Sequence, residues 1–136
     1  MRPVGMVEPV VRQMILCEEV ERDPDNPRRI NIMGLMNTVI VPPDEPMPFL
    51  LRQIAVYLLL AGGRGPATLS LSAYQAESEE MVYETAGRSV DLGQDPLRAH
   101  GLIHRMQDVG IHERGVYCIR FRYNGREIAE QFFEVR

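Results

Sequence analysis

Side chains that alternate between apolar and polar recur along most of this chain, and they constrain the fold more than any other feature. The clearest run is ATLSLSAYQAE (67–77), in which Leu69, Leu71 and Ala73 would face one way and the residues between them the other. No long stretch keeps apolar residues at helical spacing behind a capping residue. Turn signals separate the runs roughly every 8–12 residues, which is typical of an antiparallel two-sheet sandwich of about seven or eight short strands.

One domain accounts for the whole length. At 136 residues the chain can bury a core without disulfides or metals. We predict a single domain over 1–136, with an N-terminal arm at 1–11. The proline-rich stretch PPDEPMPF (42–49) excludes regular structure and favours a crossover between the sheets.

Composition and charge argue against several classes of partner. The net charge of −4 disfavours a nucleic-acid binder, which needs a basic field to neutralise phosphates. The longest apolar run, 54–61, is too short to span a bilayer, so we expect no membrane partner. Pro3, Glu8 and Pro9 interrupt any signal-like core, which leaves the cytoplasm as the expected location. The glycine-rich stretch AGGRGP lacks the phosphate-binding pattern, and we expect no cofactor.

The segment LLRQIAVYLLLA (50–61) is apolar on both faces of a predicted strand. Its core face would carry Ile54, Val56, Leu58 and Leu60. The opposite face would carry Ala55, Tyr57 and Leu59, although an antiparallel sandwich strand normally turns polar residues to water. Either Met6–Val11 covers this second face or another subunit does, and we favour a homodimer with Ala55, Tyr57 and Leu59 as the interaction face.

The two cysteines, Cys17 and Cys118, could form a disulfide, a metal pair or a reactive thiol. No CxxC motif or histidine partner stands near either residue, so we interpret both as free strand thiols. Arg120 lies two residues from Cys118 and would share its face.

Three histidines, His100, His104 and His112, form a further candidate set for a metal site. On a strand, residues four apart are roughly 13 Å apart, so His100 and His104 alone cannot hold one ion. His112 or a carboxylate such as Asp108 or Glu113 would have to fold back onto them. We therefore expect no metal site and keep this set as the weaker hypothesis.

The dipeptide Asn124-Gly125 predicts a tight hairpin, because a type I′ turn needs positive φ at both central residues. The turn sets a register in which Tyr123 opposes Arg126, Arg122 opposes Glu127, Phe121 opposes Ile128 and Arg120 opposes Ala129. Continued unbroken, this register would bury Glu130, while Phe133 and Val135 look like inward residues. We therefore predict a bulge between Ala129 and Gln131.

The stretch HERGVYCIRF (112–121) resembles the corner of immunoglobulin-type sandwiches, acidic-x-Gly-x-Tyr-x-Cys. Glu113, Gly115 and Tyr117 occupy its first three marked positions, and Ile119 stands where that pattern has cysteine. The resemblance implies an immunoglobulin-like Greek key in which the Tyr117 hydroxyl reaches back to nearby backbone. It does not bring the inter-sheet disulfide, since Cys118 is one residue early.

At whole-chain level the sequence is similar to an uncharacterised family of small bacterial proteins of unknown function. The similarity rests on ILCEEV (15–20), INIMG (30–34) and GVYCIRFRYNG (115–125). It implies a β-sandwich but no activity.

Two functions follow as hypotheses. The first is a non-catalytic module for protein interaction or self-association, with a homodimer or an unknown protein as partner. The alternative is a metal-dependent or small-ligand enzyme that uses His100, His104 and His112 with nearby carboxylates.

Overall fold

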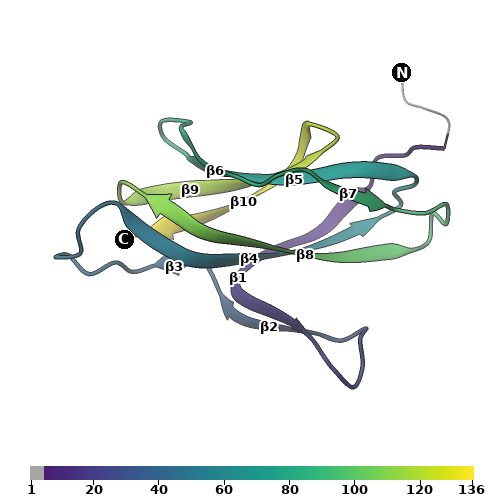
Figure 1. Cartoon of the computed structure of the whole chain (residues 1–136), viewed down its shortest axis with the longest axis horizontal. Helices are drawn as coiled ribbons and strands as arrows, with labels where there is room; N and C mark the ends of the chain where they lie inside the picture. Colours follow the sequence, from purple (N-terminus) through teal and green to yellow (C-terminus); the bar gives the residue numbers. More distant parts are fainter. Residues whose placement is uncertain (1–4) are drawn as a thin grey trace.

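The alternating runs form strands that stack in two layers, as the computed structural model shows for residues 5–136 (Figure 1). The strands are β1 (Val10–Arg22), β2 (Ile30–Leu35), β3 (Thr38–Val39), β4 (Phe49–Ala61), β5 (Pro66–Gln75), β6 (Met81–Glu84), β7 (Arg88–Asp91), β8 (Ala99–Ile111), β9 (Gly115–Tyr123) and β10 (Arg126–Val135). Over the described range, the chain forms no helix of the length and apolar character needed to cross a membrane.

A four-stranded sheet and a six-stranded sheet make up the two layers. The first has the order β2-β1-β4-β8, and the second has the order β3-β10-β9-β5-β6, with β7 also paired to β5. The all-β sandwich is therefore confirmed, with two differences. Strands β3, β6 and β7 have only two to four residues and raise the number of strands to ten. One pair, β3 with β10, is parallel rather than antiparallel.

The core lies between the two sheets. The predicted inward residues of β4, Ile54, Val56, Leu58 and Leu60, are all fully buried in it. The same is true of Leu69, Leu71 and Ala73 on β5. Both alternation predictions are confirmed, because a strand that buries one face must send every second side chain to the core.

The stretch 28–41 contains two strands, which are divided between the sheets. β2 pairs with β1 in one layer, and β3 pairs with β10 in the other. The proline-rich stretch then returns the chain to β4, as the predicted crossover requires. Of the predicted arm at 1–11, residues 1–4 lie outside the described range, and β1 already begins at Val10.

The closing hairpin has the predicted turn, with φ of 48° at Asn124 and 82° at Gly125. A bulge is present, but it lies between Glu127 and Ala129, earlier than predicted. Ala129 therefore opposes Phe121, and Glu130 opposes Arg120. The earlier shift turns the Glu130 carboxylate to the outer face beside a guanidinium, which avoids the cost of burying it unpaired.

Tyr117, at the start of β9, makes the backbone contact that its sequence context predicts. Its hydroxyl donates a hydrogen bond to the carbonyl oxygen of Glu113 at 2.7 Å. Its ring stacks on Phe133 with centroids 5.6 Å apart. The next residues alternate as expected, since Ile119 lies in the core and Cys118 pairs across the strands with the half-exposed Phe132.

Candidate interaction surface

The outer face of the four-stranded sheet carries a second apolar cluster. Its side chains form three rows across β1, β4 and β8, which are Cys17–Ala55–Arg105, Ile15–Tyr57–Ile103 and Gln13–Leu59–Gly101. A Cβ atom on Gly101 would stand 3.0 Å from the Tyr57 hydroxyl. The absence of a side chain at that position therefore leaves room for the tyrosine ring against β8.

The hairpin formed by β1 and β2 covers most of this cluster. β1 leaves β4 after Cys17 and continues as a hairpin below the four-stranded layer (Figure 1). Val20 on the hairpin is fully buried against the cluster, and Ile30 and Ile32 pack beside it. The apolar second face of β4 is thus covered from within the chain.

This cover corrects the predicted interaction face. Ala55 is fully buried and Tyr57 is only 9% exposed, so the prediction that they form an open surface is wrong. The segment Met6–Val11 is not the cover either, since Val7 instead pairs with Arg64. Leu59 is only partly buried and remains a candidate contact residue.

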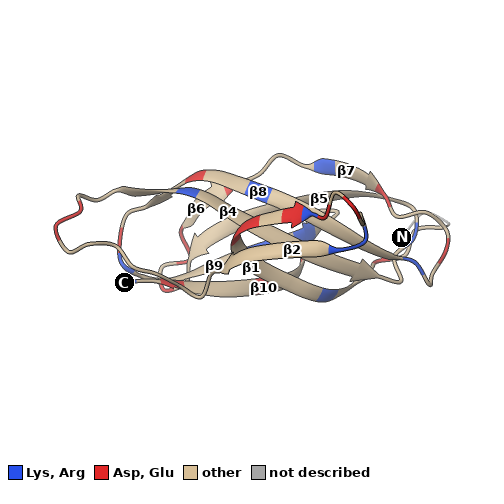
Figure 2. Cartoon of the chain, turned by 90° about the horizontal axis from the view of Figure 1, so that it is seen from below, with Lys and Arg blue, Asp and Glu red and all other residues tan. Residues whose placement is uncertain are grey.

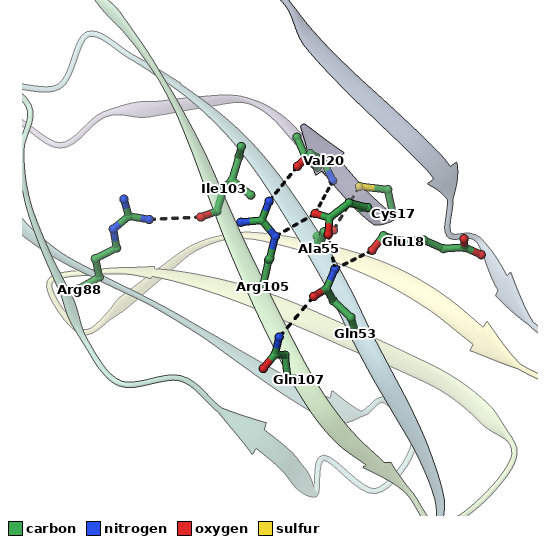
Figure 3. Close-up of polar contacts among 10 residues, drawn as sticks. Cys17, Glu18, Val20, Gln53, Ala55, Arg88, Ile103, Arg105 and Gln107 are labelled. Carbon is green, nitrogen blue, oxygen red and sulfur yellow. Dashed lines mark hydrogen bonds and ion pairs between the residues drawn. The ribbon is translucent and has the colours of Figure 1, made fainter. Parts of the chain in front are cut away.

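A polar network attaches the hairpin to the sheet (Figure 3). Arg105 on β8 donates from Nε to the Glu19 carboxylate at 2.8 Å and from Nη2 to the carbonyl oxygen of Val20 at 2.9 Å. Gln53 on β4 donates to the other Glu19 oxygen at 2.9 Å. Two neighbouring strands therefore hold one carboxylate of the hairpin.

These donors stabilise the ionised form of Glu19. The hydrogen bond from Gln53, followed by those from the Val20 amide and Arg105, lowers the pKa of Glu19 to about 2. The side chain is still 35% exposed. Water therefore screens the ion pair, and its contribution to stability is modest.

A groove of about 550 Å³ lies between the hairpin and β8. Its lining combines apolar and charged side chains, namely Val20, Glu21, Arg22, Pro24, Ile103 and Arg105. Figure 2, which views the molecule from this side, shows one basic position on β8 and both acidic and basic positions on the hairpin.

The outer face of the six-stranded sheet has a different chemistry. Arg120 and Arg122 stand side by side on β9 and lie within 4 Å of four carboxylates, those of Glu79, Glu84, Glu127 and Glu130. The predicted pair of Arg122 with Glu127 is confirmed at 3.6 Å. Tyr74 accepts a hydrogen bond from Arg122 and carries the Arg120 guanidinium 4.3 Å from its ring centroid. The two arginines are therefore held by the fold.

Both cysteines are free and buried, one on each outer face. Burial raises the pKa of the Cys17 thiol above its ordinary value, and the nearby Glu19 charge adds to the shift. Burial and a hydrogen bond to Glu130 raise the pKa of Cys118 to about 11. A thiol reacts as its thiolate, so neither residue is an activated nucleophile.

The three histidines are not brought together. His100 contacts the carbonyl oxygen of Leu92 at 2.9 Å, and His112 is exposed. His104 is 8% exposed, and burial, with the charge of Arg88, lowers its pKa to about 4. Among residues 5–136, no three or more His, Cys, Asp and Glu side chains converge as a metal site requires.

The residues that organise this surface were not singled out from the sequence. Glu19, Gln53 and Arg105 do share strand parity with Cys17, Ala55 and Ile103, so alternation alone places them on one face. Their meeting depends on the strand order β1-β4-β8, which no local signal predicts.

Comparison with known proteins gives a family but no activity. None of the curated proteins matches the chain. One solved structure that resembles it is Pseudomonas fluorescens alkylpurine DNA glycosylase AlkC bound to DNA containing an abasic site analog, with 14% sequence identity and a TM-score of 0.47. That match covers 73% of this chain and 27% of the glycosylase, so the chain spans about a quarter of that protein.

The family model agrees with the resemblance noted in the strand motifs. A family of unknown function (DUF6941) matches residues 12–136, which span every strand from β2 to β10 and nearly all of β1. The chain therefore belongs to this family of unknown function (DUF6941).

Proposed function

We propose that the protein is a non-catalytic interaction module that associates with a second copy of itself through the outer face of the four-stranded sheet. The observation that carries this proposal is the apolar row Ile15–Tyr57–Ile103 with Leu59 beside it, which the hairpin covers only in part. Ile15, Leu59 and Ile103 keep partly exposed side chains at the margin of the cover. A surface that remains apolar beyond its own cover gains free energy when a partner completes the burial.

We further propose that the sandwich is an immunoglobulin-like Greek key. With β1, β4 and β8 as strands A, B and E, and β10, β9, β5 and β6 as G, F, C and C′, both sheet orders agree with that topology. The Tyr117 hydrogen bond to Glu113 supports the same assignment, because a tyrosine corner begins strand F. Strand D would be absent, and β2 would be an addition.

A polypeptide partner suits this protein better than a nucleic acid. The chain has a net charge of −4, and the arginine pair on β9 is matched by four carboxylates. Two buried free thiols are also compatible with the reducing environment of the cytoplasm, where we propose the protein acts.

Size-exclusion chromatography with light scattering tests the self-association. We expect a mass of two chains at about 100 μM, falling toward one chain on dilution. Leu59→Glu should shift the equilibrium to the monomer, because it places a charge on the margin of the apolar row. Leu97→Glu is the matched control, since Leu97 is 92% exposed in the loop before β8. A wild-type protein that stays monomeric at this concentration would remove the proposal.

A further inference from the structure

One edge of β8 has no strand partner among residues 5–136. This 13-residue strand ends the order of the four-stranded sheet and pairs only with β4. An unpaired edge presents a row of backbone donors and acceptors to which another extended chain can add.

Two side chains occupy the open carbonyls of this edge. Arg22 on the hairpin donates to the Gly101 oxygen at 3.1 Å, and Arg88 on β7 donates to the Ile103 oxygen at 3.2 Å. In an antiparallel ladder the N–H and C=O of one residue point to the same side. The amides of Gly101 and Ile103 therefore face away from β4 as well. Farther along β8 the Gln107 amide donates to the Tyr83 hydroxyl at 3.4 Å, so the template for a new strand lies in 99–105.

The two capping arginines have no acidic partner among residues 5–136, a feature that they share with other arginines such as Arg12 and Arg52. Arg105, Arg120 and Arg122, by contrast, each have a carboxylate within 4 Å. The edge of β8 is thus bordered by unneutralised positive charge.

A partly apolar groove lies beside the same edge. The groove between the hairpin and β8 is lined by Val20, Pro24 and Ile103 together with the charged residues Glu21, Arg22 and Arg105. A strand added to β8 would turn every second side chain toward this groove. The backbone of such a strand would pair with the β8 edge. Its acidic side chains could reach Arg22 and Arg88, and its apolar side chains could enter the groove.

We propose that the β8 edge binds an extended acidic segment of another protein by strand addition. The amides of the incoming segment take over the carbonyls of Gly101 and Ile103. The guanidiniums of Arg22 and Arg88 are then free to bind its carboxylates, as charge-assisted hydrogen bonds favour. The site goes beyond the self-association proposed above, because a second copy would bring arginine against arginine at this edge.

The competing explanation is that the arginines only guard the edge against aggregation, as side chains on edge strands often do. The two explanations differ in one consequence. If Arg22 and Arg88 only protect the edge, no extended chain should bind there. If they can be displaced, a chain that carries carboxylates should bind.

Two eight-residue probes separate these explanations. One is a fluorescein-labelled peptide that alternates Glu with Val and Thr, and the other has Lys in place of Glu. We expect fluorescence anisotropy to show at least tenfold tighter binding of the acidic probe at low salt, since only it complements Arg22 and Arg88. The double variant Arg22→Gln and Arg88→Gln should weaken that binding about tenfold, while Arg12→Gln, an exposed position on β1, should change it less than about twofold.

Hydrogen exchange locates the binding without any variant. The acidic probe should slow exchange of the outward-facing amides of Gly101, Ile103 and their alternate neighbours in 99–105 in the wild-type protein, because they gain strand partners. Equal binding of the two probes, no binding at about 1 mM, or binding that leaves 99–105 unprotected would each overturn the proposal. A monomeric protein that binds the acidic probe would refute the self-association and leave strand addition standing.

Discussion

The two outer faces of the sandwich each bury a cysteine, but they do so by different means. Over the four-stranded sheet, the chain folds its own hairpin onto the row of Tyr57 and seals Cys17 beneath aliphatic side chains. Over the six-stranded sheet no strand returns, and Arg120 lies across Tyr74 with Glu130 beside Cys118. Apolar side chains cover the cysteine on one face, and a network of ion pairs covers the cysteine on the other.

This difference has consequences for stability. Apolar burial depends on area and is insensitive to moderate salt, whereas partly exposed ion pairs weaken as salt screens them. The charged cover also leaves an excess of carboxylates, since Arg120 and Arg122 are surrounded by four of them. We therefore expect the hairpin face to contribute more free energy of unfolding and the arginine face to respond more to ionic strength.

Removal of the Tyr57 ring should have the largest effect. Tyr57→Ala leaves a cavity between the hairpin and the sheet, and we expect a loss of about 3 kcal/mol in the free energy of unfolding. Tyr57→Phe is the control and should lose much less, because it keeps the ring. Urea unfolding measures both variants.

Thiol labelling shows which face the change has opened. In Tyr57→Ala, Cys17 should react with a disulfide reagent many times faster than in the wild type, while Cys118 on the other sheet should keep its slow rate. Equal acceleration of both thiols would mean that the two faces are not independently covered.

His104 lies between the faces and should dominate the response to mild acid. Its folded pKa of about 4 is below the ordinary value of 6.5, so the unfolded chain binds the proton more tightly in this interval. Stability is therefore complete above pH 6.5 and is lost as the pH falls toward 4, by about 2 kcal/mol between pH 7 and pH 5. Urea unfolding across this range should give a flat profile for His104→Phe and the wild-type slope for His112→Phe.

Arg120 tests the charged cover. Arg120→Ala removes the cation over Tyr74 and leaves Glu79, Glu127 and Glu130 without a shared partner. We expect a loss of about 1–2 kcal/mol at low salt. Added salt should recover part of this loss by screening the carboxylates from one another. Arg136→Ala, which breaks an exposed pair with Glu134, should cost much less than Arg120→Ala. A salt-independent loss in Arg120→Ala would indicate that packing, rather than charge, covers this face.

Much of the fold could be predicted because its signals are local. Alternation in β4 and β5 assigns the core side chains, and Asn124-Gly125 sets the register of the last hairpin near its turn. The bulge lies closer to the turn than the sequence predicts. Its position depends on the ion pair between Glu130 and Arg120, which is a contact between two strands and leaves no local signal. Local patterns thus predicted the strands better than their irregularities.

The candidate surface was predicted less well, for a related reason. The apolar second face of β4 correctly indicated that something covers Ala55 and Tyr57. Val20, however, joins that cover only because β1 leaves β4 after Cys17, and alternation from Leu16 would have placed it toward the main core. The change of direction of β1 after Cys17 therefore does not alter the alternation of apolar and polar residues in the sequence.

Glu19 offers the finest test of how the hairpin is attached. Its folded pKa of about 2 lies below the ordinary 4.5, so its contribution is present above pH 4.5 and is lost as the pH falls from 4.5 toward 2. Glu19→Gln should therefore cost less than about 1 kcal/mol at pH 6, because the side chain is partly exposed, and should cost less at pH 3, where the wild type has already lost part of this contribution. Hydrogen exchange of the hairpin amides, compared between wild type and variant at the two pH values, separates this effect from protonation of His104. Glu18→Gln is the matched control, since Glu18 is exposed and makes no ion pair within residues 5–136. If Glu19→Gln loosened the hairpin equally at both pH values, the attachment would depend on the shape of the side chain rather than on its charge.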